Sequence, residues 1–98
     1  MEEVLIKTDK VSVRILELEA GGALPWHSHS EVTDYVFALD GKIEVQLRSP
    51  DGKVALAPGQ RCDVPTGRVH RVMNMCQRKT EYLIIQGVGK YDFNKAGS

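Results

Sequence analysis

Short apolar segments separated by turn residues are the feature of this sequence that most limits how the chain can fold. Ile43, Val45 and Leu47 alternate with polar residues, which is the period of a strand buried on one face. Similar segments occupy about 4–7, 11–18, 33–39, 53–57, 61–64, 69–75 and 80–88. Turn sequences such as Asp40-Gly41 and Pro58-Gly59 lie between them, and no window has the pattern of a capped amphipathic helix. The sequence therefore predicts an all-β chain of about eight strands.

The length and strand spacing favour one closed or two-layered β domain. An open sheet of this many strands would leave long unpaired edges, so we expect a small barrel or a double-sheet jelly roll. A chain of 98 residues is expected to bury about 60 to 70% of its unfolded surface, which is enough for a core without disulfide or metal support. We find no linker or repeat, and we expect the tail beyond Phe93 to be loosely ordered.

Charge and hydropathy exclude several classes of partner. Thirteen basic residues balance thirteen acidic ones without a long block of like charge, so we expect neither a nucleic-acid nor a membrane partner. The apolar runs are too short to span a bilayer, and the first ten residues lack the pattern of a signal peptide. We therefore expect a cytoplasmic protein. Cys62 and Cys76 are not at CxxC spacing, and we expect both to be small buried residues.

The chain has three histidines, and two of them form the pair His27-Ser28-His29. On a strand, residues i and i+2 point to the same face, so both imidazoles can bind one metal ion. The alternative is a pair of solvated residues in the polar loop "PWHSHSE". Two acidic residues follow: Glu31 continues the same face of a straight strand, whereas Asp34 converges only if residues 30 to 33 turn or bulge. Physics alone leaves both acids open, and His70 alone would be read as an ordinary partly buried histidine.

The spacing around these histidines carries a family resemblance. Gly21 is followed after five residues by His27 and His29, after four more by Asp34, and after six more by Gly41. This order resembles the first motif of the cupins, a glycine, five residues, HxH, three or four residues, Glu, six residues and Gly.

A second pattern matches the second cupin motif at every position. Gly59 is followed after five residues by Pro65-Thr66-Gly67, after two more by His70, and after three more by Asn74. The 17 residues between the motifs, 42 to 58, resemble the shortest, bacterial type of cupin. The chain thus looks like a small single-domain cupin of the conserved-barrel type, an all-β jelly-roll barrel also called a double-stranded β-helix. The resemblance implies one domain over residues 1–98, with the barrel core at about 11–88 and a tail at about 90–98.

The resemblance also implies a metal site made of His27, His29, Asp34 and His70. Aspartate stands where the family usually has glutamate, so the side chain is one methylene shorter, and Glu31 remains the competing acid. Three imidazoles and a carboxylate suit a divalent transition metal ion, namely Fe, Mn, Ni, Zn, Co or Cu, with one or two positions left open on an octahedral ion. A closed structural zinc site would instead be tetrahedral and often contain cysteine.

Metal-binding cupins include dioxygenases, decarboxylases, isomerases and plain binding proteins, so the fold does not choose a function. We expect a metal-dependent, dioxygenase-like enzyme acting on a small oxygen-bearing substrate. The alternatives are a non-catalytic module that binds or senses a small ligand or metal, an isomerase or decarboxylase, and a domain whose metal only fastens the barrel mouth. Catalytic residues are not assigned.

Further side chains are candidates for supporting roles. The arginines that could hold a substrate carboxylate are Arg14, Arg48, Arg61 and Arg71. Trp26 is expected to wall the site, or else to lie at the barrel rim or in a dimer interface. The titratable groups left for proton transfer are Tyr35, Glu31, Cys62 and Tyr82. We also expect a homodimer formed through sheet edges, which would bury outward apolar residues such as Phe37 and Tyr82.

Overall fold

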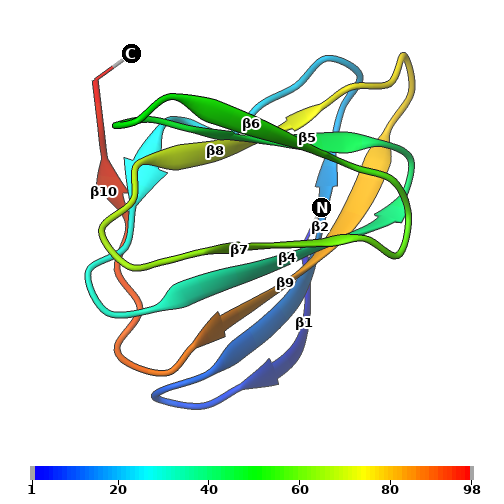
Figure 1. Cartoon of the computed structure of the whole chain (residues 1–98). Coiled ribbons are helices and arrows are strands. Elements are labelled where there is room, and N and C mark those ends of the chain that lie inside the picture. The colour runs from blue at the N-terminus through cyan, green and yellow to red at the C-terminus, as the bar shows by residue number, and fades with distance from the viewer. Residues whose placement is uncertain (1, 98) are drawn as a thin grey trace.

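The computed structural model describes residues 2–97 and consists of two five-stranded sheets that face each other (Figure 1). The first sheet has the order β1 (Glu2–Lys7), β2 (Ser12–Leu18), β9 (Thr80–Gly87), β4 (Thr33–Asp40) and β7 (Arg61–Val64). The second sheet has the order β10 (Asn94–Lys95), β3 (His27–Ser28), β8 (His70–Asn74), β5 (Ile43–Leu47) and β6 (Gly52–Leu56). All strand pairs are antiparallel, which confirms the predicted all-β fold.

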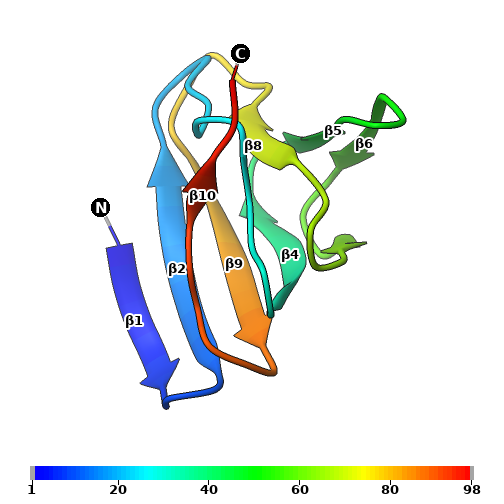
Figure 2. The same cartoon turned by 90° about the vertical axis from the view of Figure 1, so that its left-hand side faces the viewer.

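The eight strands expected from the apolar segments are all present, each within about two residues of its expected bounds. Two further strands, β3 and β10, were not expected, and they pair with each other in the register Asn94 with Ser28 and Lys95 with His27. The expectation of a loose tail beyond Phe93 is therefore wrong for these residues. The segment from β9 to β10 runs across one end of the two-layered structure (Figure 2).

The core lies between the sheets and follows the period of two. In β9 the buried residues are every second one, Thr80, Tyr82, Ile84 and Gln86. The inward residues of β4, Asp34, Val36 and Ala38, lie beside them because β4 pairs with β9. The main apolar cluster is made of Leu18, Val36, Ala38, Ile43, Val45, Leu56, Val64, Val72, Tyr82 and Ile84. Toward one end of the barrel, this apolar filling gives way to buried polar side chains.

Tyr82 corrects one expectation about the surface. Its side chain is fully buried in the core, so Tyr82 does not lie on an outer face where a second chain could cover it. Phe37 does point outward, and its ring is partly buried with the Arg61 guanidinium carbon 5.9 Å from the ring centre. β1 is an edge strand whose residues are all exposed. Residues 2–97 include no helix with the length and apolar content to cross a membrane.

Two residues of the recognised motifs stabilise the backbone and do not lie among the candidate metal ligands. Gly41 has a φ of 85°, and a Cβ added there would lie 2.5 Å from Cγ2 of Thr80, so only glycine fits. Asn74 is 1% exposed. Its amide nitrogen donates to the carbonyl oxygens of Leu18, Glu19 and Arg78, and its Oδ1 accepts from the backbone N–H of Cys76. Asn74 thereby ties the end of β8 to the end of β2.

Candidate metal centre

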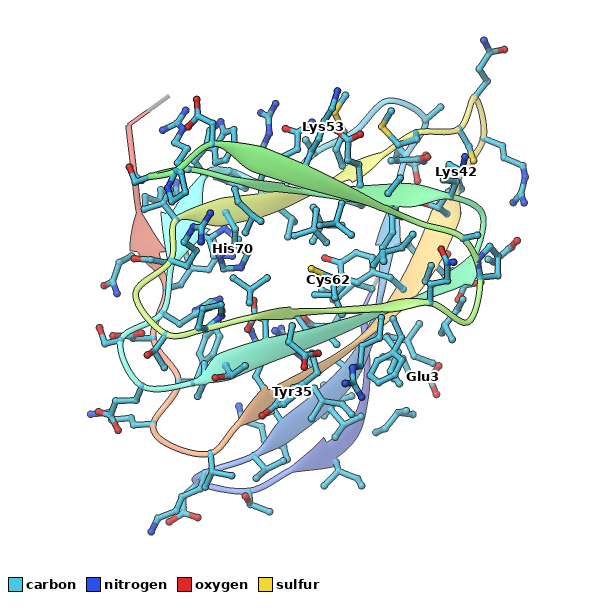
Figure 3. The ribbon with its side chains drawn as sticks, in the orientation of Figure 1. Glu3, Tyr35, Lys42, Lys53, Cys62 and His70 are labelled. Atoms are coloured by element: carbon cyan, nitrogen blue, oxygen red, sulfur yellow. The ribbon has the colours of Figure 1, made fainter. Side chains whose placement is uncertain are left out.

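His27, His29, Asp34 and His70 come together at one end of the barrel interior. Each offers one ligand atom, and these atoms all lie within 4.8 Å of one another. The side chains come from both sheets, and each of the four residues is at most 3% exposed. Figure 3 shows His70 between the two sheets, whereas Lys53 lies on the outer side. The solvated-loop alternative for the histidine pair is therefore wrong.

The chain direction between the histidine pair and Asp34 explains how an aspartate reaches the cluster. His27 pairs with His70 across β3 and β8 in the second sheet, while Asp34 lies on β4 in the first. A bend at residues 30–31 carries the chain from one sheet to the other and resets which side chains face inward. Glu31 lies in this bend, is exposed, and accepts a hydrogen bond from the backbone N–H of Lys90 at 3.2 Å. The structure thus places Asp34, and not Glu31, among the imidazoles.

Backbone carbonyl groups orient all three imidazole rings. The Nδ1 atoms of His27, His29 and His70 lie 2.7, 2.6 and 2.8 Å from the carbonyl oxygens of Pro25, Asp92 and Arg68. A carbonyl oxygen only accepts, so each Nδ1 carries the proton and donates. In a neutral ring, Nε2 then keeps its lone pair and can bind a metal ion. Fixing the tautomer in this way is the usual role of outer partners around a metal-binding histidine.

The contacts inside the cluster require a shared positive charge. Nε2 of His70 lies 2.8 Å from Oδ2 of Asp34, and Nε2 of His29 lies 3.2 Å from the same oxygen. With Nδ1 protonated, a neutral imidazole would bring two lone-pair atoms together, which is repulsive unless a proton or a cation lies between them. Nε2 of His29 is buried and has no hydrogen-bond partner within the described chain. These donors fit a divalent metal ion, so the cluster could hold one.

The amide of Gln86 orients the carboxylate of Asp34 through its other oxygen. Gln86 is 3% exposed, and its Nε2 donates to Oδ1 of Asp34 at 3.0 Å, which leaves Oδ2 for the imidazoles. Oε1 of Gln86 accepts from the guanidinium Nη2 of Arg14 at 2.7 Å. Because the carboxylate only accepts and the guanidinium only donates, the amide has one possible orientation. Gln86 therefore holds the shorter acid in place, and sequence reasoning missed it because a glutamine at the end of an apolar strand carries no motif.

The pKa values of the two histidines of the pair are shifted in opposite directions. Burial, together with the neighbouring imidazoles, lowers the pKa of His27 to about 4, although the Pro25 carbonyl works against this. Burial acts most strongly against a charge on His29, but the nearby Asp34 carboxylate and the Asp92 carbonyl and carboxylate together outweigh burial and raise the pKa. The pKa of Asp34 is lowered, because hydrogen bonds from His29 and His70 outweigh the cost of burying a carboxylate. Near neutral pH, His27 is thus unprotonated and its Nε2 could bind a metal ion, and any proton shared by His29 and Asp34 would have to leave before a metal ion could bind there.

The C-terminal segment forms a wall of the centre, which the sequence analysis did not anticipate. The ring of Phe93 stacks on His27, with 4.3 Å between ring centres, and Tyr91 lies 5.4 Å from His29 by the same measure. Asp92, between them, supplies the carbonyl oxygen for His29 and accepts the backbone N–H of Ser30 through Oδ1 at 2.8 Å. The alternation of aromatic and polar residues in "YDFN" is the signal that could have indicated a short strand here.

The proposed substrate anchors lie in different places. Arg14 is bonded to Gln86 and so lies beside the centre. Arg48 and Arg71 instead cover the ring of Trp26, with guanidinium carbons 3.9 and 4.6 Å from its centre. Because Trp26 precedes the inward-facing His27, its ring lies on the opposite side of the sheet and does not wall the centre. Arg61 pairs with Asp63 at 2.9 Å on the surface.

None of the candidates for proton transfer contacts the cluster within the part of the chain described. Tyr35 and Glu31 face away from it, since Tyr35 alternates with the inward Asp34 and Glu31 lies in the outer bend. Burial raises the pKa of the Tyr82 hydroxyl and of the Cys62 thiol. Cys62 packs against the core and lies between the sheets (Figure 3), and it forms no disulfide with Cys76. At neutral pH neither buried group is a base.

Comparison with known proteins places the chain in a family. A profile described as the cupin domain matches residues 14–86, so the chain belongs to the cupin family. None of the curated proteins is similar enough to count as a match.

Solved structures share the fold at low identity. An uncharacterised conserved protein with a double-stranded β-helix domain from Klebsiella pneumoniae is 20% identical and has a TM-score of 0.83, over 100% of this chain and 84% of that one. A cupin superfamily protein from Desulfitobacterium hafniense is 19% identical and has a TM-score of 0.77, over 90% of this chain and 76% of that one. An oxalate oxidase is 16% identical, with a TM-score of 0.81 over 89% of this chain and 46% of that one. These matches confirm the double-stranded β-helix and not an activity.

Proposed function

We propose that this cupin binds a divalent transition metal ion through Nε2 of His27, His29 and His70 and Oδ2 of Asp34. The observation that supports it most strongly is the contact between lone-pair atoms at the centre, 2.8 Å from His70 to Asp34, on rings whose Nδ1 atoms are committed to carbonyl groups. A three-nitrogen, one-oxygen donor set accepts Fe, Mn, Ni, Co, Cu or Zn. The absence of cysteine from the set and the apolar core elsewhere argue against a structural zinc ion.

We further propose that the centre serves a dioxygenase-like oxidation of a small oxygen-bearing substrate. A bound metal ion supplies a Lewis acid and a site where oxygen groups can be activated. The chain itself would exclude water through Phe93 and Tyr91 and orient the acid ligand through Gln86. The lack of a free base among the described side chains at the centre favours oxygen chemistry over an isomerase or decarboxylase, in which a side chain moves the proton.

A non-catalytic binding or sensing module is the second candidate. It is favoured by the burial of the centre, since all four ligands are at most 3% exposed and Phe93 covers one of them. A module that senses metal needs no route for a substrate. The oxalate oxidase shares only the fold with this chain, so its activity does not decide between the two candidates.

We also propose a homodimer formed through β1. Val4, Leu5 and Ile6 are 50, 48 and 57% exposed on this edge strand, which is an unpaired template for another chain. Light scattering should give twice the monomer mass of 10.9 kDa, and replacing Ile6 with lysine should shift it toward the monomer. A monomer at all concentrations would contradict this part of the proposal.

The experiment that tests the function is elemental analysis of protein purified from its own host, followed by oxygen-uptake assays. The substrates would be small diketones, thiols and hydroxy acids. Iron in the protein and substrate-dependent oxygen uptake, both lost in His70→Ala, support the oxygenase. Stable metal binding without uptake on any substrate contradicts it and favours the binding module.

A further inference from the structure

A groove of about 330 Å³ lies beside the metal centre, where β1 and β2 face the C-terminal segment. Val4, Val11, Val32 and Tyr91 give it apolar walls, and Gln86 also lines it. This volume is at the lower end of the range for ligand sites, which fits a small molecule. None of the four cluster residues lines the groove, but Gln86 borders it and also bonds to Asp34. A ligand in the groove would therefore lie one side chain away from the centre.

Arg14 gives the groove a fixed cation. One guanidinium nitrogen, Nη2, donates to Oε1 of Gln86, and the other, Nη1, lies 2.6 Å from Oε2 of Glu2. The guanidinium carbon lies 5.6 Å from the ring centre of Tyr91, and the Arg14 side chain is only 19% exposed. The neutral amide and the aromatic ring hold the guanidinium in one orientation without neutralising its charge. Its carboxylate partner Glu2 is thus a contact that an anionic ligand could replace.

Glu2 is a weakly held partner for Arg14. Its side chain is 46% exposed and belongs to β1, the exposed edge strand. An ion pair with one partner as exposed as Glu2 contributes little to stability, so replacing Glu2 with another carboxylate costs little. The charged residues lining the groove are three cations and two acids, Lys7, Lys10, Arg14, Glu2 and Asp9. Displacement of Glu2 would leave a local excess of positive charge, which favours an anion.

We propose that this groove binds a small carboxylate with a short apolar body, and that Arg14 holds the ligand carboxylate in the place that Glu2 occupies. The apolar body lies against the valine side chains and Tyr91. For its biological role this inference rests on the proposed function, because it assigns the substrate class of the metal centre as carboxylates. The binding chemistry itself needs only Arg14 and the groove walls.

The test is calorimetric titration of the full chain with butyrate, acetate and the neutral isostere butyramide, with and without metal. We expect saturable binding of butyrate in both forms, weaker binding of acetate, and no binding of butyramide. Arg14→Gln should weaken butyrate binding by roughly tenfold or more, because a charged hydrogen bond is lost. Glu2→Gln should tighten it about two- to fivefold, because the competing carboxylate is removed. Arg61→Gln, at a surface arginine away from the groove, should leave it unchanged.

Three outcomes would overturn the inference. Butyrate that binds only the metal-loaded protein, equally in wild type, Arg14→Gln and Glu2→Gln, would show that the ligand binds the metal ion and not the groove, and the proposed function would stand. Butyrate that binds no form, or binds Glu2→Gln no better than wild type, would also refute the inference. If the protein takes up no metal but butyrate binding still weakens in Arg14→Gln and tightens in Glu2→Gln, the result would support ligand binding in the groove and refute the metal-dependent function. Glu2 is exposed, so its variant remains informative even if Arg14→Gln fails to fold.

Discussion

Removing the titratable group at His27 should change how stability depends on pH. Burial lowers the pKa of this imidazole from 6.5 to about 4, and the residue is 3% exposed, so solvent screens it little. A depressed pKa means that the unfolded chain takes up a proton before the folded chain does. The contribution is therefore fully present above pH 6.5 and is lost as the pH falls toward 4. The difference between the pKa of His27 in the unfolded chain and in the folded chain corresponds to about 3 kcal/mol of the free energy of unfolding.

The assay is urea unfolding of chelator-treated wild type and His27→Asn across this pH range. Asparagine keeps a donor near the Pro25 carbonyl but does not titrate. We expect the stability of wild type relative to the variant to fall by about 3 kcal/mol as the pH falls from 6.5 to 4. His29→Asn is the matched control with the opposite sign, and for this variant the pH range is extended above 6.5. The pKa of His29 is raised, so its contribution is fully present below pH 6.5 and is lost as the pH rises through the folded value. A constant difference between wild type and His27→Asn would refute the reasoning about a buried neutral imidazole.

Three further changes separate the roles of residues around the centre. In metal titrations, Asp34→Asn should weaken metal binding by at least roughly tenfold to hundredfold, which is the loss typical when a residue that only supports a metal ligand is replaced. Glu31→Gln should leave metal affinity unchanged. The reverse result would make Glu31 the acid ligand. Gln86→Leu should weaken metal binding by roughly tenfold while β-sheet circular dichroism is retained, and unchanged affinity would remove Gln86 from any positioning role. Asn74→Ala should lower the free energy of unfolding by about 2 to 4 kcal/mol, since three carbonyl oxygens and one N–H lose their partner, and leave metal affinity unchanged. A loss of metal affinity at full stability would instead place Asn74 at the centre.

Strands such as β5 could be predicted because a period of two persists over five residues. In β5, three apolar side chains alternate with polar ones, and its bounds agree with the expectation. The inward face of β9 was harder, because residues 82 to 85 are apolar on both sides of the strand. The structure buries Tyr82 and Ile84 and leaves Leu83 and Ile85 only partly buried. A run without alternation does not show which face is inside, and the error about Tyr82 has this cause.

The centre could be predicted only where spacing carries information. The histidine pair and His70 follow recognisable motifs, but the choice of Asp34 depends on the bend at residues 30–31, whose geometry the sequence leaves open. The Phe93 wall and the Asp92 carbonyl depend on a two-residue strand that pairs with another two-residue strand. Pairs this short carry only a weak periodic signal, which here is the alternation of aromatic and polar residues at 91–94. They form because the C-terminal segment finds hydrogen-bond partners on β3 and on the residue before it, where the Trp26 carbonyl accepts from the backbone N–H of Ala96.

Anomalous diffraction from crystals of the cobalt-loaded protein would show whether the three imidazoles and Asp34 bind one ion. We expect one strong peak inside the barrel, about 2.0 to 2.2 Å from Nε2 of His27, His29 and His70 and from Oδ2 of Asp34. Its height should depend on cobalt in the crystal and vanish in His70→Ala. A cobalt ion bound by other atoms would contradict the claim that these four side chains share one ion. A fully loaded crystal with no peak among the three imidazole rings would contradict it as well.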